Sequence, residues 1–206
     1  MLLESELRIL IILFPIMASF LLLTSCDRAI DQKEQVPETK LGTEKIATPI
    51  ENGALESASG LKAQLLYDNA GSEAPKVEFF SPDGSKNNLT NYRGRPLLLN
   101  LWATWCGPCR VEMPSLDTLA ALEEGKLTVL TVSQDLEGGK VVRPFFEKYQ
   151  FANLQGHYDP QNNLWKAVGA SALPVTILYD ENGIEKWRVV GGLEWDDEMV
   201  ADLIHQ

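Results

Sequence analysis

The feature that most constrains the fold of this chain is a pair of cysteines between an apolar run and a helical pattern. Residues 97–102 are large and apolar except for Asn100, which predicts a central strand buried on both faces. The sequence Cys-Gly-Pro-Cys follows at 106–109, and residues 107–124 have the pattern of a helix with leucines on its inner side. We therefore expect Cys106 to stand where a buried strand leads into the start of a helix.

This placement favours redox chemistry. The thiolate is the reactive form of cysteine, and an unperturbed thiol, with a pKa of about 8.5, is mostly protonated at neutral pH. The unpaired N–H groups and partial positive charge at a helix N-terminus stabilise a thiolate on Cys106. Cys109 lies one turn further, and Pro108 suits the first turn because it has no N–H to leave unpaired. We expect Cys106 to be the nucleophile and Cys109 to resolve the mixed disulfide.

Charge and cysteine count exclude other classes of protein. The formal net charge is -11 and no cluster of Lys or Arg stands out, so we expect no nucleic-acid binding, which needs a basic surface. A Cys-x-x-Cys pair can form half of a metal site. The chain, however, has only three cysteines, fewer than the four ligands of a structural zinc site. We expect neither a metal nor a bound cofactor.

The N-terminus predicts export and lipid attachment. Residues 9–23 form an apolar run of about 15 residues, which matches a signal-peptide core and is shorter than a membrane-spanning helix of roughly 20 residues. The run ends in Leu-Thr-Ser-Cys, which resembles a bacterial lipobox, so we expect residues 1–25 to be a signal peptide cleaved before a lipidated Cys26. The alternative is an uncleaved signal anchor. Asp27 resembles a signal for retention in the inner membrane, and either interpretation leaves the remaining chain outside the cytoplasm.

Residues 26–59 have the composition of a flexible tether. The segment has no aromatic residue, few large apolar residues and many Glu, Lys, Thr and Pro. It cannot bury enough apolar surface to offset the entropy of ordering it. As a coil of about 33 residues it reaches roughly 30 Å from its anchor. We therefore expect the folded domain to occupy residues 60–206.

The rest of the domain alternates strands and helices. In chain order we expect a strand and turn at 77–84, a helical turn at 89–92, a strand at 97–102, a helix at 107–124, a strand at 127–132, helices at 140–149 and 164–168, a hairpin of strands at 175–179 and 184–190, and a helix at 196–205. The apolar residues that share one face of the first two helices are Leu116, Leu119, Leu122, Val141, Phe145 and Tyr149. The order from residue 97 is β-α-β-α-(β)-α-β-β-α, with an additional strand allowed between the second and third helices, and it predicts an α/β fold with a central mixed β-sheet and helices on both faces.

The segment 99–114 resembles the active site of the TlpA-type, membrane-tethered thiol–disulfide reductases of the thioredoxin superfamily. The resemblance covers about residues 74–206 and identifies Trp105, Gly107 and Pro108 as residues that support the cysteine pair. It implies a thioredoxin-like fold with an N-terminal hairpin and a helix–strand insertion after the second central strand.

The resemblance also implies that Pro174 is a cis-proline facing the two cysteines. A fold can impose this isomer because a cis X-Pro bond costs only about 0.5–1 kcal/mol. The alternative is an ordinary proline that precedes a strand. Gly191 and Gly192 are expected to let a loop approach the active site, although turn formation explains them equally well.

Two polar residues distinguish the TlpA-like branch from thioredoxin itself. Asn100 stands six residues before the first cysteine. At the corresponding position, thioredoxins have a buried Asp. An amide cannot accept a proton from the resolving thiol as a carboxylate does. Glu112 lies three residues after Cys109 and shares its helix face. The resemblance implies that Glu112 tunes thiol acidity or proton transfer; the alternative is a solvated helix residue.

The resemblance implies a reductant that works in an oxidising compartment. Its substrates are expected to be exported proteins that carry disulfides, in cytochrome c maturation or copper-centre assembly, and an electron-delivering membrane thiol reductase is expected to reduce it again. We expect a monomer, lipid-anchored at the periplasmic side of the inner membrane.

Two alternatives to the reductant remain. Potentials of such cysteine pairs range from about -270 to -120 mV, and Gly-Pro between the cysteines resembles the reducing end, but an oxidase or isomerase uses the same chemistry. A copper-binding assembly chaperone is the alternative from another class, with the two thiolates as soft ligands. Dedicated copper chaperones of this fold share a Cys-x-x-x-Cys motif and a distal His. The two cysteines of this chain are spaced one residue closer.

Overall fold

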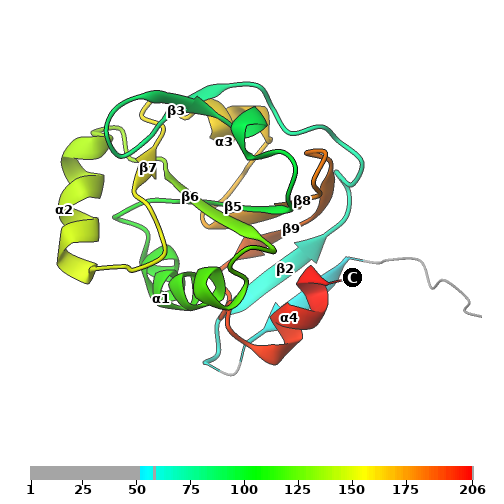
Figure 1. Cartoon of the computed structure of the whole chain (residues 1–206). Coiled ribbons are helices and arrows are strands. Elements are labelled where there is room, and N and C mark those ends of the chain that lie inside the picture. The colour runs from blue at the N-terminus through cyan, green and yellow to red at the C-terminus, as the bar shows by residue number, and fades with distance from the viewer. Residues whose placement is uncertain (1–51, 58, 206) are drawn as a thin grey trace, which may run out of the picture. The chain divides into compact units, whose positions relative to one another are not determined.

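Strand β5 (Leu97–Trp102) is the centre of the structure because all six of its residues are buried. It pairs in parallel with β6 (Thr128–Ser133) and antiparallel with β8 (Val175–Tyr179). The computed structural model describes residues 52–57 and 59–205, and in it β5 lies in the middle of a mixed sheet in the order β1-β2-β9-β8-β5-β6-β7-β3-β4 (Figure 1).

The other strands are β1 (Gly53–Glu56), β2 (Lys62–Leu66), β3 (Glu78–Phe80), β4 (Lys86–Asn88), β7 (His157–Tyr158) and β9 (Glu185–Gly191). The helices are α1 (Gly107–Leu122), α2 (Gly139–Tyr149), α3 (Asn163–Ala167) and α4 (Glu198–Ile204), with a 3-10 turn η1 at Leu89–Tyr92. Among the described residues, no helix is both long enough and apolar enough to cross a bilayer.

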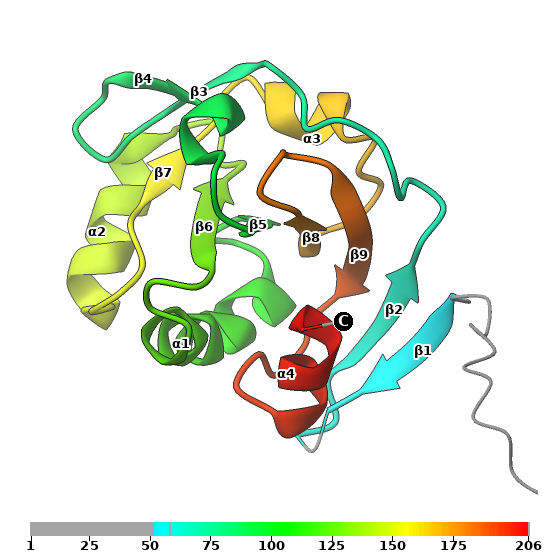
Figure 2. The same cartoon turned by 45° about the vertical axis from the view of Figure 1, so that its right-hand side comes forward.

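Two hydrophobic clusters cover the two faces of the sheet. Leu98 and Trp102 of β5 belong to the cluster that includes the buried sides of α1 and α4. The alternate residues of β5 belong to the second cluster, which includes Phe79 of β3 and Leu164 of α3. Figure 2 shows α1 and α4 on one side of the sheet and α3 on the other. This arrangement confirms the predicted fold class and the predicted order of elements from β5 to α4.

The N-terminal part of the sheet differs from the prediction. Residues 53–56, which we assigned to the tether, form β1 and pair with β2, which itself extends the sheet beside β9. Three of the four β1 residues are exposed, because backbone hydrogen bonds rather than side-chain burial hold this edge strand. The sheet therefore includes residues that precede residue 60. The predictions for residues 1–25 and for Cys26 lie outside the described residues.

The buried faces of two helices also differ in part from the prediction. Leu122 is 63% exposed, because the buried face of α1 ends at Leu119, one turn before the helix does. In α2 the fully buried residue is Val142, whereas Val141 is half-buried and Tyr149 is 39% exposed. Helical periodicity predicts which residues share a face, but not how far along the helix its partner extends.

We predict that Leu99→Ala lowers the free energy of unfolding by about 2–5 kcal/mol, because it opens a cavity in the hydrophobic cluster that packs against the middle of β5. Leu122→Ala is the matched control, and on an exposed position it should change the value by less than about 0.5 kcal/mol. Urea unfolding of the oxidised protein, followed by circular dichroism, measures both values. Equal effects of the two substitutions would contradict this account of the core.

Candidate active site

Cys106 lies at the N-terminus of α1, where the chain turns from β5 into the helix. It is the N-cap residue, and the backbone N–H of Cys109 donates a hydrogen bond to its Sγ at 3.3 Å. A disulfide joins the two cysteines, whose Cα atoms are 5.3 Å apart. Cys106 is 6% exposed and Cys109 is 0% exposed, so only Cys106 can be reached from solvent.

A buried carboxylate holds the segment that leads to Cys106. Asp135 accepts hydrogen bonds from the backbone N–H and the hydroxyl of Thr104, both at 2.8 Å, and from the hydroxyl of Ser133 at 2.7 Å. Asp135 is 2% exposed and lies two residues after the end of β6. Because the carboxyl ends of parallel β5 and β6 lie at the same edge of the sheet, this residue comes next to the active-site segment.

The loop before β8 and the end of β9 complete the surroundings of the cysteines. The peptide bond between Leu173 and Pro174 is cis, and the carbonyl of Pro174 accepts a hydrogen bond from the N–H of Gly191 at 3.0 Å. Gly191 has a φ of 108°, a conformation that strongly favours glycine. A Cβ on Gly192 would lie 3.4 Å from the Cβ of Pro108, so this loop passes close to the start of α1.

Glu112 is fully buried below the cysteine pair, so its interpretation as a solvated helix residue is wrong. Its Oε1 accepts a hydrogen bond from the Nδ2 of Asn100 at 2.8 Å. Its Oε2 accepts one from the backbone N–H of Leu193 at 3.2 Å and one from the indole N–H of Trp195 at 3.1 Å. The carboxyl group therefore connects α1, β5 and the segment after β9.

Burial and hydrogen bonding act in opposite directions on this carboxyl group. Removal from water disfavours the charged form and raises the pKa of Glu112 to about 7, while the hydrogen bonds from Trp195, Asn100 and Leu193 partly offset that rise. A carboxyl group with a pKa near neutrality can both accept and release a proton under ordinary conditions.

Several residues of this site were not identified from the sequence. Trp195 and Leu193 reach Glu112 across 83 and 81 positions of the chain, and no local pattern connects them. Asp135 carries a weak signal, because it comes shortly after the second predicted buried strand, at residues 127–132. The described residues contain no group of three or more His, Cys, Asp or Glu side chains arranged to hold a metal ion.

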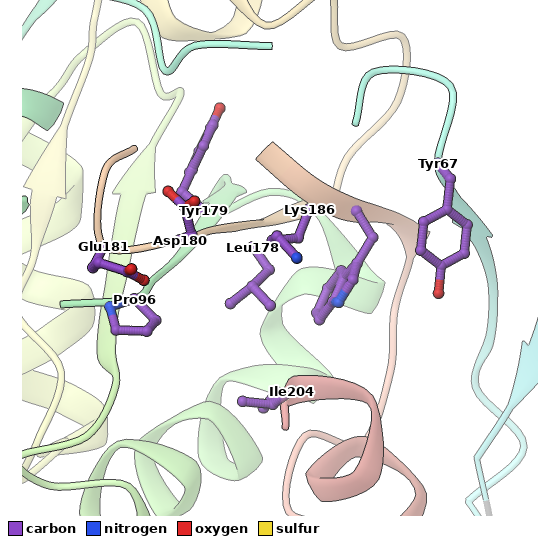
Figure 3. A pocket seen from close by; sticks show the side chains of 9 residues that line it. Tyr67, Pro96, Leu178, Tyr179, Asp180, Glu181, Lys186 and Ile204 are labelled. Atoms are coloured by element: carbon purple, nitrogen blue, oxygen red, sulfur yellow. The ribbon is translucent and has the colours of Figure 1, made fainter. Parts of the chain in front are cut away.

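The chain also has a hollow of about 340 Å³ away from the cysteines (Figure 3). Figure 3 shows Leu178, Ile204 and Tyr67 around it. The hollow lies at the Tyr179 end of β8, whereas the cis-proline precedes the opposite end of that strand. It therefore takes no part in the chemistry of the two cysteines.

Comparison with known proteins agrees with this geometry. The family model Redoxin matches residues 69–204. The chain is 32% identical over 127 residues to the thiol-disulfide oxidoreductase ResA of Geobacillus thermodenitrificans, covering 62% of this chain and 72% of ResA. It is 34% identical over 145 residues to the thiol:disulfide interchange protein DsbE of Pseudomonas fluorescens, covering 68% and 78%.

A solved structure has the same fold. The crystal structure of a DsbE-type thiol:disulfide interchange protein from Chlorobium tepidum superposes with a TM-score of 0.59 at 27% identity, covering 66% of this chain and 95% of that one. Residues 69–204, which the family model matches, contain the cysteine pair, the cis-proline and the buried Glu112. The chain therefore belongs to the Redoxin family and is a thiol–disulfide oxidoreductase of the TlpA-like branch, with a thioredoxin-like fold.

Proposed function

We propose that this oxidoreductase reduces disulfides of exported proteins, with Cys106 as the attacking residue and Cys109 as the resolving residue. The observation that carries the proposal is the position of Cys106 at the start of α1. Cys106 is more exposed than Cys109, and its Sγ accepts a hydrogen bond from the backbone N–H of Cys109. That N–H and the helix N-terminus stabilise negative charge on the sulfur.

The exchange takes place in two steps. The Cys106 thiolate attacks one sulfur of the substrate disulfide, that bond breaks, and the second substrate sulfur leaves and takes up a proton. Cys109 then loses its proton and attacks the Sγ of Cys106, which releases the first substrate sulfur as a thiol. Two electrons pass to the substrate, and the protein is left with the Cys106–Cys109 disulfide seen in the structure.

Glu112 is proposed to exchange the proton of Cys109 in the second step. Both side chains are fully buried, and a spacing of three residues places them on the same face of α1. Its pKa of about 7 lies near the operating pH, which suits a general base. Asn100 supports this role by donating to Glu112 and also to the hydroxyl of Thr176, at 2.9 Å.

The cellular setting is proposed from the N-terminus and from the resemblance to TlpA-type reductases. We infer cleavage after residue 25, a lipid on Cys26 and a tether that ends near Gly53, where β1 begins. The domain then works as a monomer at the periplasmic side of the inner membrane. Cytochrome c maturation or copper-centre assembly supplies the substrates, and a membrane thiol reductase supplies electrons.

We predict that Cys109→Ser traps substrates of the full-length chain as mixed disulfides in the native host, because Cys106 still attacks but nothing resolves the product. Non-reducing electrophoresis and mass spectrometry identify the partners. Cys106→Ser is the control and should trap none. A reactive Cys106 that captures nothing would contradict disulfide exchange, and a midpoint potential near -120 mV rather than near -270 mV would contradict the reducing direction.

We predict that Glu112→Gln slows resolution of the mixed disulfide by about a hundred-fold at pH 7.5, the lower range for loss of a general base. In the wild type the rate should rise as the pH passes through about 7, where Glu112 becomes a carboxylate. In the variant the rise should move towards the range of an ordinary thiol, about 8.5. Stopped-flow measurement on a preformed mixed disulfide gives both profiles, and coinciding profiles would exclude this role.

Stability measurements distinguish the titration of Glu112 from a general loss of packing. Because its pKa is raised from 4.5 to about 7, the folded protein holds a proton that the unfolded chain releases between these values. The stability from this group is complete below pH 4.5 and falls as the pH rises through 7, by about 3 kcal/mol in total. Urea unfolding at pH 4.5 and 7.5 should show this loss in the wild type and not in Glu112→Gln.

We predict that Cys26→Ser abolishes both lipid labelling and membrane association of the chain, because the thiol is the attachment point of the anchor. Labelled palmitate and cell fractionation measure the two properties. Retention of the variant in the membrane without label would favour the uncleaved signal anchor instead.

A further inference from the structure

A second hollow, of about 320 Å³, lies beside the reactive cysteine. Its lining residues are Trp105, Gln134, Asn162, Trp165, Ser171, Ala172 and Leu173. Trp105 directly precedes Cys106, and Leu173 directly precedes the cis-proline. The hollow therefore adjoins the place where a substrate disulfide meets the Sγ of Cys106, and its walls come from segments far apart in the chain.

The wall nearest to Cys106 is held in place before any substrate arrives. Thr104 is fixed by two hydrogen bonds to the buried Asp135, and Trp105 follows it directly. The indole of Trp105 is nevertheless 70% exposed, the same fraction as Leu136 and the highest among the large apolar side chains of the described residues. An exposed aromatic ring on a fixed segment next to a nucleophile is typical of a surface that a partner covers.

Two amide oxygens at this hollow have no hydrogen-bond donor. The Nε2 of Gln134 donates to the carbonyl of Val132 at 3.2 Å, and because a carbonyl can only accept, this bond distinguishes the amide nitrogen from the amide oxygen. Gln134 is 5% exposed, and its Oε1 is buried and accepts no hydrogen bond from any residue that the structure describes. The same holds for the Oδ1 of Asn162 within residues 52–57 and 59–205.

The Asn162 side chain is not needed by the helix that it precedes. An asparagine before a helix usually accepts a hydrogen bond from the first turn. Here Asn162 has left-handed backbone angles and makes no such bond, because Asp159 accepts from the N–H of Leu164 at 2.7 Å instead. A buried acceptor without a donor is unfavourable, so a ligand that supplies N–H groups would recover free energy here.

The combination of groups indicates the chemistry of that ligand. Two indoles attract cations through their ring faces, and amide oxygens accept hydrogen bonds from N–H groups. No side chain that lines the hollow is ionisable, and the chain as a whole carries a formal net charge of -11, which favours a positive ligand. A guanidinium group combines a flat surface for stacking, five N–H donors and a permanent charge.

We propose that this hollow is a specificity subsite that binds a basic side chain, arginine above all, located next to the attacked cysteine of the substrate. The guanidinium stacks on Trp165 or Trp105 and donates to Gln134 and Asn162 after small rotations of their amides. The subsite rests on the proposed exchange at Cys106, and it selects among substrates without changing the chemical step.

Peptide disulfides test the proposal. The reduced full-length protein is mixed with peptides that differ only in the residue preceding the cysteine, which is Arg, citrulline, Leu or Glu, and kcat/KM is measured by fluorescence. We expect the Arg peptide to react about ten-fold faster than the Leu peptide, with citrulline between them and Glu slowest, because a cation on an indole and one or two hydrogen bonds have about that effect.

Gln134→Leu should reduce this preference to about two-fold or less, while the rate with oxidised glutathione stays within two-fold of wild type. Gln155→Leu is the matched control, since Gln155 is exposed and lies outside the hollow, and it should keep the full preference. Trp165→Leu provides a second test if Gln134→Leu does not fold, and it should lower the same preference.

The outcomes separate this proposal from the proposed function. Loss of reaction with every disulfide, oxidised glutathione included, would overturn the exchange itself. Normal reaction with oxidised glutathione but equal rates for the Arg, citrulline, Leu and Glu peptides would overturn the subsite alone. A preference for Arg that survives in both Gln134→Leu and Trp165→Leu would show that it arises elsewhere, and would overturn the location.

Discussion

The buried carboxyl group of Glu112 is the interaction on which the rest of the active site depends. A carboxyl group removed from water needs hydrogen-bond donors, and here they come from Asn100 in the central strand and from Leu193 and Trp195 near the C-terminus. These bonds connect the helix that carries both cysteines to the sheet and to the C-terminal segment. The hydroxyl of Ser115, which accepts from the N–H of Trp195 at 3.0 Å, adds a third hydrogen bond between α1 and that segment.

A second buried carboxylate has a separate task. Asp135 holds Thr104 and so fixes the segment between β5 and α1, whereas Glu112 lies one turn beyond Cys109. One acid therefore positions the backbone that presents Cys106, and the other is the group proposed to exchange the proton of Cys109. The two carboxyl groups differ in their surroundings. Asp135 accepts hydrogen bonds from Thr104 and Ser133, whereas removal of Glu112 from water raises the pKa of its carboxyl group.

The exposed side of the site has a different character from its interior. Below Cys109 both carboxyl oxygens of Glu112 accept hydrogen bonds, although the Oδ1 of Asn100 accepts none among the described residues. Beside Cys106 the indole of Trp105 is exposed, and the amide oxygens of Gln134 and Asn162 accept no hydrogen bond within the same described residues. A reductase that acts on proteins must hold a peptide while two disulfides exchange, so an exposed indole beside the nucleophile and a hydrogen-bonded carboxyl group behind it are consistent with one mechanism. In the proposed mechanism, proton transfer takes place in the interior and substrate selection at the surface.

The sequence by itself determined the cysteine pair at the start of a helix, the buried strand before it, the hairpin before α4 and the order of elements from β5 onwards. These features depend on local periodicity and on turn residues, which neighbouring positions specify. Only the tertiary structure decided that Glu112 is buried, that Leu122 is exposed, that residues 53–56 belong to the sheet, and that Gln134 and Trp165 meet beside Cys106. Each of these depends on contacts between distant parts of the chain, such as Trp195 with Glu112, and no local pattern encodes such contacts.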